Sequence, residues 1–167
     1  MVLRRVWVGA VVLVCGAAMA TGQAMPQTAG ETLSGSAVTL AQVVRGQRVV
    51  LVAGFSRAGG EGTGAWVKAV EADPALKGVA VWQVAMLAGV PGFVRGMIQS
   101  GMRKGVTAAE QERFVVLTQD EAEWRSYFGV AEDNVPYVML LDAGGKVQWR
   151  GHGAAAGMEP ALRGAAR

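Results

Sequence analysis

Residues that commonly carry out catalysis are scarce in this sequence, which has one cysteine, Cys15, and one histidine, His152, among its 167 residues. Cys15 lies within an N-terminal apolar run that we expect to be removed, so the mature chain is predicted to lack a thiol nucleophile, a disulfide and a thiolate metal ligand. His152 stands between two glycines, without the spaced nucleophile or ligand cluster that a general base or a metal site requires. The sequence therefore predicts no catalytic residue, no metal and no cofactor, and it excludes dithiol oxidoreductase and cysteine peroxidase chemistry.

The first 20 residues have the pattern of a signal peptide. Arg4 and Arg5 form a basic start, residues 6–20 are an apolar run, and Ala18-Met19-Ala20 offers small residues at a cleavage site. This run is shorter than the ~20 residues that span a bilayer, so we expect cleavage and a periplasmic or secreted protein, with an uncleaved anchor as the alternative. Because two of the 16 Lys+Arg residues lie in this segment, the remaining chain has 14 basic against 13 acidic residues, and no nucleic-acid binding is predicted.

The rest of the chain is predicted to form one domain at residues 37–164, preceded by a flexible tether at residues 21–36, which are small and polar without periodicity. Within the domain, short valine-rich runs alternate with amphipathic segments, which predicts a parallel sheet covered by helices on both faces. Leu40 is expected to pack on the core. The predicted strands are residues 48–54, 78–87 and 114–117, the predicted helices are residues 65–72, 91–104, 120–128 and 159–163, and a hairpin is predicted at residues 134–153.

The hairpin sequence NVPYVMLLDAGGKVQWRGHG, residues 134–153, favours one fold class. The alternation of strands and helices alone would also fit a flavodoxin-like sheet. A Val-Pro step, an apolar strand, a tight turn and a second strand together are typical of a thioredoxin-like α/β fold, with a central mixed sheet, a C-terminal antiparallel hairpin and flanking helices. In that fold the position of the motif suggests a cis bond between Val135 and Pro136, and the sequence leaves the isomer open. The backbone before Pro136 can pair with an extended peptide, and the alternative that Pro136 serves folding alone stays open.

The thiols of thioredoxin-like oxidoreductases lie between the first core strand and the following helix, a segment that reads FSRAGGEGT here, residues 55–63. Gly60 and Thr63 fall at about the two thiol positions, and neither can form a disulfide. A strand, a glycine loop and a helix start could also bind a phosphate. The loop lacks the Gly-Lys-Ser/Thr ending of a phosphate loop, however, so a turn filled with small residues is the better interpretation.

The helix predicted at residues 91–104 carries three basic residues, Arg95, Arg103 and Lys104. They could bind an acidic partner or lipid headgroups, or they could form an ordinary solvated helix face. Phe93, Met97 and Met102 are expected roughly on one side of this helix, and the methionines, Met86 included, are predicted to fill the core.

Residues 93–153 resemble the mitochondrial ATP synthase assembly factor family known as ATP-ten, which has bacterial relatives. The resemblance rests on a few short stretches: Arg103-Lys104 followed by Glu110-Gln111, the strand that starts at Phe114, the strand from Tyr137 to Asp142, and KVQWRGHG from Lys146 to Gly153 with Glu159 and Leu162 beyond it.

The resemblance implies a thioredoxin-like fold, generally without the redox pair, in a chaperone that helps a membrane subunit of ATP synthase to assemble. It makes Arg103, Lys104 and Trp149 candidate partner-contact residues, beside Val135 and Pro136. The expected function is an exported, non-redox protein that binds a protein partner, such as a membrane protein subunit, and that contacts the membrane surface. The alternatives are an enzyme that uses the scaffold without cysteine and a purely structural envelope protein.

Overall fold

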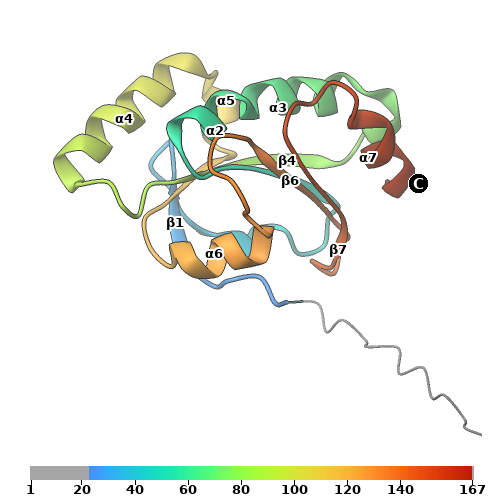
Figure 1. Cartoon of the computed structure of the whole chain (residues 1–167), viewed down its shortest axis with the longest axis horizontal. Helices are drawn as coiled ribbons and strands as arrows, with labels where there is room; N and C mark the ends of the chain where they lie inside the picture. The colour runs from blue at the N-terminus through green and yellow to red at the C-terminus, as the bar shows by residue number, and fades with distance from the viewer. Residues whose placement is uncertain (1–22, 167) are drawn as a thin grey trace, which may run out of the picture.

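The computed structural model describes residues 23–166, which form one mixed sheet of seven strands in the order β2-β1-β5-β4-β3-β6-β7 (Figure 1). Strands β3, β4 and β5 are parallel, whereas β6 runs antiparallel to β3 and β7 antiparallel to β6. The strands are β1 (Ala29–Thr32), β2 (Ala37–Thr39), β3 (Val49–Gly54), β4 (Ala80–Met86), β5 (Phe114–Leu117), β6 (Tyr137–Leu141) and β7 (Val147–His152). The predicted α/β class, mixed sheet and C-terminal antiparallel hairpin are confirmed.

Helices cover both faces of the sheet, with α2, α3, α4, α5 and α7 above it in Figure 1 and α6 below it. The helices are α1 (Leu40–Val43), α2 (Arg57–Glu61), α3 (Thr63–Ala72), the 3-10 turn η1 (Pro74–Leu76), α4 (Gly92–Gly105), α5 (Ala108–Gln111), α6 (Glu121–Phe128) and α7 (Glu159–Ala165). Each predicted helix is present to within about two residues at each end. None of the helices described in residues 23–166 is long and apolar enough to cross a bilayer.

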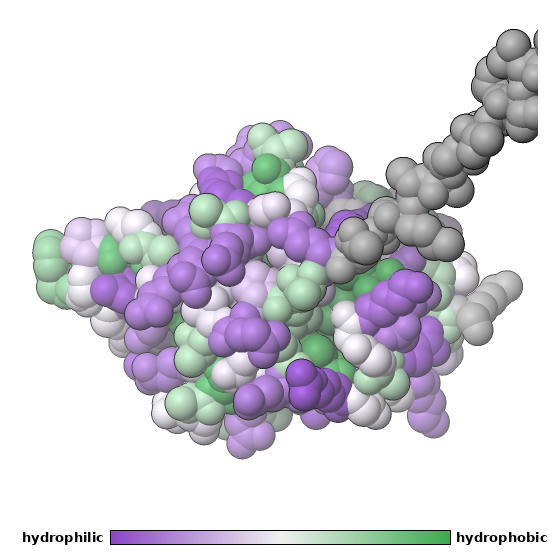
Figure 2. Space-filling model, turned by 90° about the horizontal axis from the view of Figure 1, so that it is seen from below, coloured by the Kyte–Doolittle hydropathy of each residue, from purple (hydrophilic) through white to green (hydrophobic). Residues whose placement is uncertain are grey.

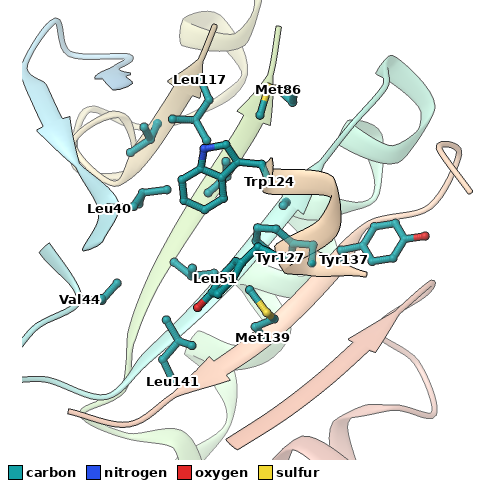
Figure 3. Close-up of a cluster of buried hydrophobic side chains, with 14 of the residues drawn as sticks. Leu40, Val44, Leu51, Met86, Leu117, Trp124, Tyr127, Tyr137, Met139 and Leu141 are labelled. Atoms are coloured by element: carbon teal, nitrogen blue, oxygen red, sulfur yellow. The ribbon is translucent and has the colours of Figure 1, made fainter. Parts of the chain in front are cut away.

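Strand β3 is the centre of the core because its whole length is apolar and every residue in it is buried. Alternate side chains point to opposite faces of a strand, so this one element contributes to two hydrophobic clusters. Leu51 packs with Trp124 and Tyr127 of α6 in the cluster drawn in Figure 3, which also contains Leu40. On the other face Val52 packs with residues of α3 and α7. The expected packing of Leu40 on the core is thus confirmed.

The prediction of a flexible tether at residues 21–36 is wrong from Ala29 onward. Residues Ala29–Thr32 form strand β1, which pairs with β2 and, through Glu31 and Thr32, with β5. A Cβ on Gly30 would lie 2.5 Å from a methyl carbon of Val115, so glycine is needed where this strand crosses the core. The small, polar composition that indicated a linker therefore reflects close packing.

The domain limits also differ from residues 37–164. The C-terminal end continues through α7 to Ala166, which is buried and accepts a hydrogen bond from the guanidinium of Arg48. At the other end, the Thr28 hydroxyl donates to the Asp120 carboxylate over 2.5 Å. The signal peptide predicted at residues 1–20 lies outside the described residues.

Candidate functional site

The segment that replaces a redox motif follows β3 and forms the short helix α2 rather than an open loop. The hydroxyl of Ser56 caps this helix by accepting the N–H of Gly59 over 3.1 Å. Gly60, at one of the two thiol positions, is half-buried, and a Cβ built on it would meet no atom within 4 Å. Thr63, at the other, is 4% exposed, and its hydroxyl donates to the Gly60 carbonyl over 2.7 Å. The two positions are neighbours, and a threonine hydroxyl satisfied by the backbone occupies the inner one.

The loop before β6 lies directly on α2. A Cβ on Gly59 would lie 2.7 Å from the carbonyl oxygen of Asp133 and 2.9 Å from that of Val135. A Cβ on Gly62 would lie 3.0 Å from the ring of Pro136. Such distances are at or below the limit for real Cβ contacts. The loop before β6 can therefore lie on α2 only because Gly59 and Gly62 have no side chains.

Pro136 is therefore buried against the glycine segment, and residues 23–166 contain no cis peptide bond. The bond between Val135 and Pro136, whose isomer the sequence left open, is trans. The carbonyl of Val135 faces Gly59, where an extended peptide would have to pair. The geometry favours the alternative in which Pro136 serves folding, and it gives no support to strand addition at this position.

Polar contacts hold the closed loop in place from both ends. The Ser56 hydroxyl donates to the Asp133 carbonyl over 2.5 Å, and the Asp133 carboxylate accepts from Arg125 over 2.6 Å. The Tyr137 hydroxyl accepts the N–H groups of Ala131 and Glu132 and donates to the Glu132 carbonyl, all within 3.0 Å. These contacts bind the loop to α2, α6 and β6 at once.

His152 contacts this cluster only through its ring, which stacks on Tyr137 with the centroids 5.5 Å apart. Its side chain is exposed at the end of β7. Within residues 23–166 no group of three or more His, Cys, Asp or Glu side chains is placed to hold a metal ion. The arrangement indicates a packing contact for His152.

The three residues that the family resemblance singled out do not form one surface. Arg103 is half-buried in α4, and its Nε donates to the Leu33 carbonyl over 2.6 Å, which ties α4 to the turn after β1. Trp149 lies on β7 at the opposite edge of the sheet, half-buried, with its ring 6.3 Å from that of Trp66. Lys104 alone is exposed. Because Val135 and Pro136 are also partly or wholly covered, Lys104 is the one exposed residue among the five candidates.

Sequence reasoning missed the outward face of α4. Phe93 is 84% and Met97 69% exposed, so the prediction that Met97 fills the core is wrong, whereas Met86 is buried. Met102 is half-buried against the cluster on β4 and β5. Met97 and Met102 are five residues apart, which places them on different sides of a helix with 3.6 residues per turn. The spacing itself could have revealed two apolar faces.

The comparisons with known proteins agree with this geometry. A protein-family model described as ATP10 protein matches residues 20–162, and no curated protein matches the chain. A proposed thiol:disulfide interchange protein DsbE from Chlorobium tepidum is 23% identical, with a TM-score of 0.58 over 86% of this chain and 93% of that chain.

Two further solved structures have the same fold. The exposed lipoprotein thioredoxin Etrx1 from Streptococcus pneumoniae is 16% identical, with a TM-score of 0.55 over 84% of this chain and 98% of that one. BsSco, a member of the Sco family of cytochrome c oxidase assembly proteins, is 12% identical, with a TM-score of 0.55 over 83% of this chain and 88% of that one. At these identities the likeness shows a thioredoxin-like fold and nothing about activity.

Proposed function

Because the chain belongs to the ATP10 protein family, whose members are ATP synthase assembly factors with a thioredoxin-like fold, we propose that it is an exported, non-redox assembly factor. It binds a protein subunit of a membrane complex such as ATP synthase and acts as a chaperone for that subunit. The family match over residues 20–162 is the observation that carries this proposal. The partner-binding surface lies away from Pro136, since that residue is covered by the glycine segment.

The assembly role is tested by deleting the gene in its native host and measuring the assembled ATP synthase on native gels. We expect less assembled complex, restored by the full chain, and crosslinks between the chain and a membrane subunit of the synthase. Normal amounts of the complex in the deletion strain, without such crosslinks, would contradict the proposal.

The proposed absence of thiol redox activity is supported by the residues at the two thiol positions. Gly60 has no side chain, and the Thr63 hydroxyl is committed to the Gly60 carbonyl. The purified chain is expected to give buffer-level rates in disulfide reductase and peroxidase assays. The matched control is Gly60→Cys/Thr63→Cys, which restores a thiol pair and is expected to reduce disulfides above the wild-type rate. Activity of the unmodified chain above buffer would overturn this part of the proposal.

Export is supported by the basic start, apolar run and small residues of positions 1–20. Cell fractionation followed by N-terminal sequencing tests it. We expect the chain in the periplasmic or secreted fraction with Thr21 as its first residue. A cytoplasmic chain that retains residues 1–20 would contradict export.

A further inference from the structure

Helix α4 presents two large apolar side chains to solvent on one side. Phe93 and Met97 are the only large hydrophobic residues that are mostly exposed within residues 23–166. They are separated by about one turn, and Lys104 follows on the same side about two turns further on. The outward positions between them are small, Gly96, Ser100 and Gly101, so the two apolar side chains project beyond the helix surface.

This helix lies in a stretch of chain with basic charge only. Between Asp73 and Glu110 there is no acidic residue, and Arg95, Arg103 and Lys104 all belong to α4. Glu110, the first carboxylate after the helix, accepts a hydrogen bond from the Thr107 backbone N–H over 2.6 Å in a capping box. Of these cations Lys104 is exposed, so the outward face of α4 carries the positive charge of Lys104 and no carboxylate of its own.

We propose that α4 is an interfacial helix that docks the protein on a bilayer containing anionic phospholipids. Phe93 and Met97 insert below the headgroups, and Lys104 pairs with lipid phosphates. At 14 residues α4 is too short to cross a bilayer, and it lies in the plane of the interface. This inference goes beyond the proposed assembly role and does not depend on which protein subunit is bound.

Two observations favour lipid over the other occupants of this face. Lysine is depleted in the cores of protein interfaces, whereas at a membrane its long stem keeps the charge at the headgroups while the apolar part is covered. The described chain begins on the other side of the sheet, where the Gln23 amide donates to the Ser126 hydroxyl of α6 over 3.1 Å. Figure 1 shows α6 and α4 on opposite faces, so the described chain begins away from this surface.

The shape of the molecule fits a docking edge. Helix α4 is at the left-hand end in Figure 1, and in Figure 2 the same end protrudes from the molecule, with pale green hydrophobic atoms among white and purple ones. Arg103 also holds α4 to the turn after β1 through the Leu33 carbonyl, so the rest of the domain fixes the helix. A fixed helix loses little conformational entropy when it binds a surface.

The test is flotation of the purified full chain with vesicles of phosphatidylcholine mixed with phosphatidylglycerol, and with vesicles of phosphatidylcholine alone. We expect binding to the anionic vesicles that weakens as salt is raised, and little binding to the neutral ones. Phe93→Ser/Met97→Ser is expected to lower the binding constant by about tenfold or more, because two apolar side chains no longer insert. Lys104→Glu is expected to lower it by about tenfold.

The matched control is Lys146→Glu, which makes the same charge change on an exposed residue of the β6–β7 turn, at the opposite edge of the sheet. Its binding should match that of the wild type. All the substituted side chains are exposed, so circular dichroism should show unchanged folding. Failure to bind anionic vesicles, equal binding to both vesicle types, or unchanged binding by Phe93→Ser/Met97→Ser would each overturn the proposal. Crosslinking of α4 to a protein subunit in place of lipid would overturn it too, and would leave the assembly role standing.

Discussion

Substituting Gly59 by alanine tests whether the loop before β6 really closes on α2. The added methyl group would lie 2.7 Å from the carbonyl oxygen of Asp133 and 2.9 Å from that of Val135. Both are backbone atoms, so no flexible side chain can move aside. The segment is also tied down by the Ser56 hydroxyl on one side and the Tyr137 hydroxyl on the other. The variant must therefore strain the contact or break those hydrogen bonds.

The expected cost follows from two opposing effects. Alanine in place of glycine within a helix stabilises it by up to about 1 kcal/mol. Overpacking of a tight contact costs about 1–3 kcal/mol, and loss of the hydrogen bond from Ser56 to Asp133 adds about 1 kcal/mol. We expect Gly59→Ala to lower the free energy of unfolding by about 1–3 kcal/mol.

Gly60→Ala is the matched control because it makes the same change one residue further along α2. A methyl group there meets no atom within 4 Å, so this variant should be more stable than the wild type by about 0.5–1 kcal/mol. Urea unfolding of the full chain, followed by tryptophan fluorescence, measures both values. If the two variants shift stability equally, the loop does not touch α2, and an open groove at Pro136 suited to peptide binding would have to be reconsidered.

The remaining predictions concern two tyrosines and an ion pair. Tyr137→Phe should lower the free energy of unfolding by about 1–3 kcal/mol, because it removes three hydrogen bonds that tie residues 131–132 to β6. Tyr127→Phe should leave the free energy of unfolding unchanged or raise it, since the Tyr127 hydroxyl is buried without a partner among residues 23–166, and burial raises the pKa of Tyr127. Urea unfolding measures both tyrosine variants, and equal losses of stability in the two would refute this contrast. Asp73→Asn should destabilise the protein at neutral pH, because a hydrogen bond from Arg163 holds the pKa of Asp73 below its ordinary value, against the effect of burial. A lowered carboxyl pKa stabilises the fold above the ordinary value near ~3.9, and this contribution is lost as pH falls through the lowered pKa. Thermal unfolding should therefore show a gap between wild type and Asp73→Asn that is full at pH about 5–7 and narrows below about 4, and a gap that does not change with pH would count against the ion pair.

Local patterns predicted the elements of this fold well because their signals come from neighbouring residues. The apolar run of β3 and the Gly-rich turn between β6 and β7 each specify structure within a few positions. Strand β1 was missed because Gly30 is required by Val115, a residue 85 positions away, and its short AGET sequence has no strand periodicity. Tertiary contact decided that element.

The candidate site was predictable in its chemistry but not in its shape. The absence of a thiol at Gly60 and Thr63 is visible in the sequence, whereas the closure of the loop depends on Gly59 and Gly62 meeting residues more than 70 positions away. In the same way, the predicted helix placed Arg103 on a basic face open to a partner or to solvent. In the structure the Arg103 Nε instead donates a hydrogen bond to the carbonyl of Leu33.

The loss of the thiols and the closure of the loop have a common physical consequence. Without a thiol to expose, contact between Pro136 and the Gly62 backbone buries apolar surface and stabilises the domain. A surface for partners must then lie elsewhere, and among residues 23–166 the large side chains left uncovered, Phe93 and Met97, are on α4. An assembly factor whose partner subunit lies in a bilayer would bind the membrane surface through such a helix before it binds the subunit.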